Sequence, residues 1–178
     1  MVLLLALQLL GLAQAPAPEP TVALILDRQL LAIEREMVTL VEALPADRMG
    51  FAPAGGEFRN VRTFAQQATH TAAVVYAVAA AILGEKNPTD MGVSENGPAS
   101  ITTKDDVVKY LKDAFAYGHK ALKTLTAENF TRMAPSPFGQ GRIPLGSLAG
   151  IVTWHSYDHY GQMVVYARMN GVVPPASR

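Results

Sequence analysis

The sequence predicts an all-α protein built as a single four-helix bundle. Four long segments carry apolar residues at alternating steps of three and four, which is the spacing of one buried helix face. No strand pattern of comparable strength accompanies them, apart from short extended pieces between Phe130 and Ile143. With 178 residues, of which 49% are hydrophobic, the chain is long enough for one domain with a large core.

Composition and charge narrow the classes of function. Fifteen Lys and Arg residues balance fifteen Asp and Glu residues, and no basic run could follow a phosphate backbone, so we expect no nucleic-acid partner. The chain has no Cys, which excludes disulfides, a thiolate nucleophile and sulfur ligands. Any metal must therefore be held by His, Asp or Glu, and the four His residues are the first candidates.

The N-terminal segment predicts a secretory signal. Residues 1–15 read MVLLLALQLLGLAQA, an apolar run of about ten residues ending in small side chains, and the stiff spacer APAPEP follows. This run is shorter than the roughly 20 apolar residues of a membrane span. We therefore expect a signal peptide and spacer at 1–20, a bundle domain at 21–178, and export to the periplasm or the extracellular space. The alternative is an ordinary amphipathic first helix in a cytoplasmic protein.

The first two helices differ in how their faces are covered. From Thr21 to Pro45 one apolar face predicts a helix with charged residues on its other side; this face consists of Leu26, Leu30, Ile33, Met37, Leu40 and Leu44. Asn60 is a candidate N-cap of the second helix. Residues 63–84 contain no Asp, Glu, Lys or Arg, so this helix should be covered on both sides and be the most buried.

The third and fourth helices have recognisable ends. Residues 103–106 resemble a capping box, and the stripe that follows is Val108, Leu111, Phe115, Gly118, Leu122 and Leu125. The fourth helix should run from about Leu145 to Asn170, because Gly171 favours a helix end and Pro174-Pro175 prevents continuation. The connections at about 85–102 and 127–144 are longer than adjacent antiparallel helices need, so at least one should cross the length of the bundle.

Polar residues replace apolar ones on the predicted buried face of the fourth helix. That face reads Leu145, Leu148, Val152, His155, His159, Gln162, Tyr166 and Met169. His155 and His159 are four residues apart, one turn from each other on one face, as two ligands of a single metal must be. His70 lies on a comparable line of the second helix and at a similar depth, which makes it the natural third ligand.

Two interpretations of these histidines remain open at this point. They could be core histidines bonded to carbonyls or waters, because an H-x-x-x-H pair alone is common by chance. Three converging buried imidazoles nevertheless need partners, since each unsatisfied one costs about 1 to 3 kcal/mol. One divalent metal would satisfy all three together.

The C-terminal third of the sequence also resembles a known family. The segment HSYDHYGQ (155–162), followed by Tyr166, Arg168, Gly171 and Pro174-Pro175, is similar to the final helix of the DinB-like (YfiT-like) metalloenzymes, and looser similarity covers about residues 22–178. The resemblance implies zinc, nickel or iron bound by His70, His155 and His159. It also implies an up-down-down-up helix order and frequent homodimers. Tyr160 departs from the family pattern, in which many members carry Arg just before Gly-Gln.

Other side chains are candidates for supporting roles. Gln66, Gln67 and Gln162 could face a metal-bound water or a substrate, and hydrogen bonding between helices is the alternative. Asp158 could orient a ligand imidazole, or it could simply be solvated. We expect the remaining candidates to be structural: His119 partly exposed, and Trp154 and Tyr157 in packing or at a dimer interface.

Three classes of function follow from these residues. The preferred one is a metal-dependent enzyme acting on a small-molecule substrate, with hydrolysis by a metal-bound water, because three His ligands leave open positions on the metal. The second is a thiol transferase that uses bacillithiol, mycothiol or glutathione, as the family resemblance implies. Export would count against it, because such thiols are cytosolic. The third is a metal-binding protein without turnover, since no confident general base lies beside the histidines.

Overall fold

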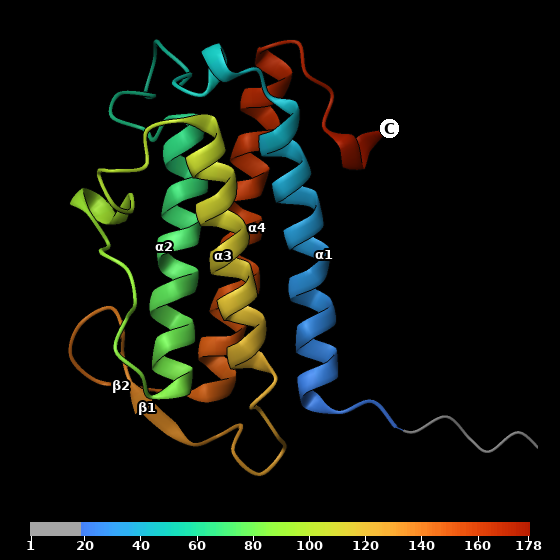
Figure 1. Ribbon diagram of the computed structural model, residues 1–178, viewed down its shortest axis with the longest axis vertical. Helices are drawn as coiled ribbons and strands as arrows, with labels where there is room; N and C mark the ends of the chain where they lie inside the picture. Colours follow the sequence, from blue (N-terminus) through green and yellow to red (C-terminus); the bar gives the residue numbers. More distant parts are fainter. Residues whose placement is uncertain (1–18) are drawn as a thin grey trace, which may run out of the picture.

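Four helices form the molecule, as the sequence predicts (Figure 1). The structure is a computed structural model that describes residues 19–178. The predicted signal peptide and spacer (1–20) lie outside the described part up to residue 18. The helices are α1 (Val22–Ala43), α2 (Phe64–Leu83), α3 (Lys104–Leu122) and α4 (Leu145–Met169). Short 3-10 turns occupy Ala46–Arg48, Val93–Glu95 and Pro175–Ser177. The strands β1 (Met133–Pro135) and β2 (Arg142–Pro144) pair antiparallel, with Ala134 opposite Ile143.

The helix directions give an up-down-down-up bundle. In Figure 1, α1 rises, α2 and α3 both descend, and α4 rises again. Helices α2 and α3 can run parallel because the connection between them (residues 84–103) returns along the length of the bundle, which confirms the expectation for a crossing connection. The connection that carries β1 and β2 stays at one end. Both α1 and α2 pack against α3 and α4, so α2 and α4 are antiparallel neighbours.

Hydrogen-bonded caps fix where three of the helices begin. The hydroxyl of Thr21 accepts from the Leu24 amide, and Thr103 with Asp106 forms the predicted capping box. The expected N-cap Asn60 is wrong: Thr63 caps α2 and forms a capping box with Gln66. The α2 amides of Phe64 and Ala65 donate to the distant carbonyls of Phe51 and Met49, so tertiary contacts decide where this helix begins. None of the described helices combines the length and the apolar content needed to cross a membrane.

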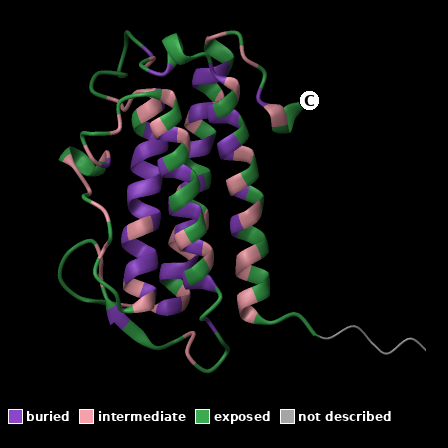
Figure 2. Ribbon diagram, in the orientation of Figure 1, coloured by how far each residue is buried: buried purple, intermediate pink, exposed green. Residues whose placement is uncertain are grey.

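The core lies between the four helices and is densest around α2, as predicted (Figure 2). Gly118 lets α3 approach its neighbours closely, because a Cβ there would meet Leu30 at 3.1 Å and Val75 at 3.2 Å. On the predicted buried face of α4, His155 and Gln162 are only partly buried, and Met169 is 56% exposed. Met163 is buried instead. The reason is that the buried stripe of α4 drifts around the helix, because 3.6 residues per turn does not match the assumed repeat.

Candidate metal centre

Three imidazoles converge between α2 and α4. His70 lies on α2, and His155 and His159 lie one turn apart on the antiparallel α4. Their ligand nitrogens all lie within 4.8 Å of one another. The ring centroids are 5.1 Å apart for His70 and His155, 4.6 Å for His70 and His159, and 4.4 Å for His155 and His159. The structure thus brings together the three residues that the sequence singles out as ligands.

Gln67 fixes the ring of His159. Its amide oxygen accepts a hydrogen bond from His159 Nδ1, and its amide nitrogen donates to Gln162 Oε1 at 3.0 Å. Because an amide oxygen can only accept, His159 Nδ1 carries the proton and the lone pair lies on Nε2. Gln67 is 2% and His159 is 6% exposed, so the hydrogen bond between them is buried. Hydrogen bonds of this kind orient metal-binding imidazoles in proteins.

A backbone carbonyl plays the same part for His70. The Nδ1 atom of His70 lies 2.9 Å from the carbonyl oxygen of Glu95, which again leaves the lone pair on Nε2. Glu95 belongs to the crossing connection, in a turn where Ser94 (φ 54°) and Glu95 (φ 59°) both adopt left-handed backbone. This costs about 1 to 3 kcal/mol per residue and is typical of functional positions. Gly92 closes the turn, since a Cβ there would lie 1.9 Å from the Gly97 oxygen.

His155 completes the group with an arrangement that fits a cation. Its Nε2 lies 3.2 Å from Nε2 of His159. Two lone pairs at that distance repel unless a proton or a cation lies between them. The buried Nδ1 of His155 finds no hydrogen-bond partner in residues 19–178. A divalent metal fits this donor set, because neutral imidazole nitrogens are ligands for zinc, nickel and iron.

Burial keeps all three imidazoles neutral at neutral pH. Desolvation and then the neighbouring His70 lower the pKa of His155 to about 4; Asp158 opposes this shift, and Arg62 has the smallest of these four effects. Desolvation and the neighbouring His155, His70 and Arg62 lower the pKa of His159 to about 3. The pKa of His70 is also lowered by burial, which outweighs the Glu95 carbonyl. The lone pairs are therefore available to a metal without loss of a proton.

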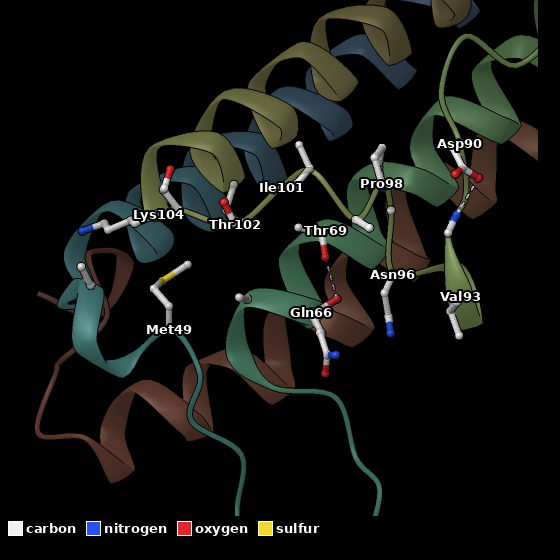
Figure 3. A pocket seen from close by; sticks show the side chains of 17 residues that line it. Met49, Gln66, Thr69, Asp90, Val93, Asn96, Pro98, Ile101, Thr102 and Lys104 are labelled. Carbon is white, nitrogen blue, oxygen red and sulfur yellow. Dashed lines mark hydrogen bonds between the residues drawn. The ribbon is translucent and has the colours of Figure 1, made fainter.

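Of the three imidazoles, that of His159 lines a polar cavity of about 690 Å³. Its lining includes His159, Gln162 and Asp158 of α4, and Arg62 and Gln67 at the start of α2. A second cavity of about 680 Å³ adjoins it and is more apolar, with Met49, Val93, Pro98 and Ile101 in its lining (Figure 3). Gln66 and Asn96 line both cavities. A substrate at the histidines would therefore meet polar surface first and apolar surface beside it.

The residues predicted to support the site differ in what they contact. Asp158 is exposed and accepts from Gln162 Nε2 at 3.4 Å, so it contacts that amide and not an imidazole; Gln67 and the Glu95 carbonyl orient the rings. The Gln66 amide oxygen is engaged in the α2 capping box, although the side chain still lines the cavity. Gln162 bonds to Gln67 across the helices and also faces the cavity.

The remaining candidates lie outside the cavity. His119 bridges α3 to α1, with Nδ1 at 2.6 Å from Asp27 and Nε2 at 3.0 Å from Glu34, so it is structural as expected. Trp154 is 59% and Tyr157 is 39% exposed, so neither is packed inside the bundle. Sequence reasoning missed Glu95 and Arg62. The glycines at 92 and 97 are the only local signal of a tight turn near Glu95, since a backbone carbonyl has no residue signature.

Comparison with known proteins agrees with this geometry. The sequence profile of the DinB superfamily matches residues 29–163. A DinB-like protein of Bacillus cereus superposes with a TM-score of 0.66 at 17% identity, covering 84% of this chain and 93% of that one. The DinB-like protein YjoA of Bacillus subtilis gives 0.63 at 18%, with 83% and 92% covered. No curated protein matches the sequence.

A third solved structure is similar in fold and carries a functional description. YfiT of Bacillus subtilis superposes with a TM-score of 0.60 at 17% identity, covering 88% of this chain and 94% of that one. It is described as a probable metal-dependent hydrolase with an unusual four-helix bundle topology. Identities this low show a similar fold alone. The superfamily match, in contrast, rests on the sequence and spans most of it. By its sequence, its helix order and its three-histidine group, the chain belongs to the DinB superfamily.

Proposed function

We propose that the protein is a metal-dependent enzyme of hydrolase type, with His70, His155 and His159 holding one divalent metal, which is zinc, nickel or iron. The observation that carries the proposal is the convergence of three neutral imidazoles, two of them held with Nε2 free, beside a polar cavity. Three protein ligands leave a coordination position for a small-molecule substrate. The description of YfiT as a probable metal-dependent hydrolase supports the same choice.

The chain's own residues have separate tasks in this proposal. A bound divalent cation supplies Lewis-acid polarisation and makes water a nucleophile near neutral pH. Gln67 and the Glu95 carbonyl keep the imidazole lone pairs aimed at one point. Asp158, on the cavity wall and held by Gln162, is the carboxylate whose Oδ atoms can accept a proton from the reaction. Gln66 and Gln162 offer amide groups to the substrate.

Metal analysis of the purified full chain tests the ligand set. We expect one metal per chain by inductively coupled plasma mass spectrometry, and loss of the metal in each of His70→Ala, His155→Ala and His159→Ala. His119→Gln is the matched control, because it replaces a partly buried histidine that bonds to Asp27 and Glu34 of α1 and does not line the cavity. A stoichiometric metal that survives all three cavity substitutions would refute the site.

Turnover assays then decide the chemistry. Protein loaded with zinc, nickel or iron should hydrolyse activated esters faster than the metal-free protein, and His159→Ala should abolish the difference. Thiol-dependent conjugation of glutathione or bacillithiol to a model electrophile, without hydrolysis, would replace hydrolase by thiol transferase. Neither activity with any metal would favour a metal-binding protein without turnover.

Two further properties belong to the proposal. We propose export, with residues 1–20 as signal peptide and spacer, which favours water over a cytosolic thiol as the nucleophile. N-terminal sequencing of the mature protein tests it: a start near residue 14 or 16 supports export, and retention of Met1 in a cytoplasmic fraction contradicts it.

We also propose a homodimer, because Trp154 and Tyr157 expose aromatic surface on one face of α4.

A further inference from the structure

Arg62 is fixed at the rim of the metal centre by one edge of its guanidinium group. It immediately precedes Thr63, the N-cap of α2. Its Nε donates to Asn96 Oδ1 at 2.8 Å, and its Nη2 donates to the Ser94 carbonyl at 2.8 Å. These two nitrogens form one side of the planar guanidinium, and both acceptors are neutral. The side chain is therefore held in one orientation without neutralisation of its charge.

The other edge of the guanidinium is open. Among residues 19–178, Nη1 has no hydrogen-bond partner and no carboxylate lies within salt-bridge distance of Arg62. An arginine keeps its charge at any pH of interest and has five N–H donors, of which two are used here. Nη1 and the second hydrogen of Nη2 thus remain as a fork of the kind that binds an oxyanion through two parallel hydrogen bonds.

Arg62 shares a cavity with the metal centre. Arg62 lines the polar cavity together with His159, Gln67 and Gln162. Asp158 is a carboxylate of the same lining, but it bonds to Gln162. The cavity therefore presents a preoriented cation beside the position where the reacting group would lie.

We propose that Arg62 is the anion-binding residue of this cavity, and that the substrate carries a carboxylate or a similar oxyanion at some distance from its reacting group. The guanidinium fork holds that anion while the reacting group lies at the three histidines. This inference rests on the proposed function and adds the substrate class to it. The competing explanation gives Arg62 a structural role alone, as a tie between α2 and the turn at 93–96.

Paired ligands separate these explanations. Monohydroxamates of the three- to six-carbon diacids bind zinc through the hydroxamate and present a terminal carboxylate. The matching compounds with a terminal amide in place of the carboxylate have nearly the same shape but no charge. We expect isothermal titration of the zinc-loaded full chain to show, at one or more lengths, a carboxylate that binds about ten-fold or more tightly than its amide. The length with the largest ratio would report the distance from the metal to Arg62.

Substitutions test whether Arg62 causes the tighter binding of the carboxylate. Arg62→Gln should reduce the ratio of the two affinities to about one, and Arg62→Lys should keep part of it, because Lys retains the charge without the fork. Arg59→Gln is the control, since it removes the same charge from an exposed neighbour that does not line the cavity. Zinc content and the thermal midpoint of each variant show whether the hydrogen bonds of Arg62 also stabilise the fold, independently of ligand affinity.

Opposite results have distinct meanings. If no carboxylate binds more tightly than its amide to the zinc-loaded protein, including the case in which no hydroxamate binds, the anion site is refuted. The anion site is also refuted if Arg62→Gln still binds the carboxylate more tightly than the amide by the same ratio, or if Arg59→Gln loses that preference equally. Failure of the wild-type protein to bind zinc through its three histidines would instead refute the proposed function.

Discussion

At the scale of single residues, Gln67 fixes the orientation of the His159 ring. A buried amide that accepts from Nδ1 and donates to Gln162 cannot be rotated without the loss of both hydrogen bonds. An apolar residue of similar size would leave a buried imidazole N–H unsatisfied and free to turn. The affinity of the site for metal should therefore depend on a residue that is not itself a ligand.

The first prediction concerns this residue. Gln67→Leu should weaken zinc binding about 10- to 100-fold, as loss of an orienting hydrogen bond typically does, while the helix content stays unchanged. Competition with a chromophoric chelator measures the zinc affinity, and circular dichroism measures the helix content. Gln67→Glu is the control, because it keeps an acceptor at the same place. Equal zinc affinity in the wild type and Gln67→Leu would contradict the role of Gln67.

The second prediction is a pH dependence of stability in the metal-free protein. The folded-state pKa values of His155 and His159 are about 4 and about 3, below the usual 6.5. Between these limits the unfolded chain binds protons that the folded chain refuses, so the free energy of unfolding falls as pH drops from about 6.5 to about 4. Urea titrations at a series of pH values measure the slope. His155→Leu/His159→Leu should flatten it, and an unchanged slope in that variant would contradict the assignment.

At the scale of elements, the short turn Val93–Glu95 contacts both Arg62 and His70. Two left-handed residues in succession aim two carbonyls, one at Arg62 and one at His70. Such strain persists only where surrounding contacts maintain it. Here the Arg62 bonds and the tight approach of Gly92 to Gly97 supply those contacts.

The third prediction separates backbone from side chain in this turn. Glu95→Gly keeps the carbonyl and relieves the left-handed strain, so zinc affinity should stay within about two-fold and stability within about 1 kcal/mol of the wild type. Gly92→Ala should lower both, because its Cβ would collide with the Gly97 carbonyl oxygen. Thermal unfolding and chelator competition measure the two quantities. The opposite ranking of these variants would show that the Glu95 carboxylate, not its carbonyl, serves His70.

Elements differ in how far the sequence determines them. The box of Thr103 and Asp106 is local, and it is predictable from four consecutive residues. The start of α2 is not predictable in this way, because carbonyls of Met49 and Phe51 compete with local caps for its first amides. Likewise the three histidines follow from helical spacing, whereas the carbonyl of Glu95 lies in a connection without periodicity.

At the scale of the whole molecule, the sequence predicts the helix order through its family resemblance, but it does not predict the shape of the cavity. Its polar wall joins the start of α2, the middle of α4 and a turn from the crossing connection. These segments are distant in sequence, and they meet only after the bundle has assembled. Arg62 therefore gains its place in the site from the path of a connection and not from any motif.

The fourth prediction concerns assembly. The exposed Trp154 and Tyr157 line a shallow hollow between α4 and α1, together with Gln29 and Ala32 of α1. Burial of this surface would favour a dimer, which sedimentation velocity should detect in the wild-type protein. Trp154→Arg should give a monomer with its metal retained, whereas Phe58→Arg, at an exposed position in the connection between α1 and α2, should leave the dimer intact. A monomer at all concentrations would contradict the proposal.

The crossing connection has a further consequence, for the dynamics of the protein. Because the Glu95 carbonyl holds the ring of His70, local opening of the connection would release that ring, and a metal bound at His70 would oppose the opening. Amide hydrogens around residues 92–97 should then exchange with solvent more slowly when metal is bound. Chelation would make the same stretch the first point of attack for a protease. The connection that allows α2 and α3 to run parallel would thus also report whether a metal is bound.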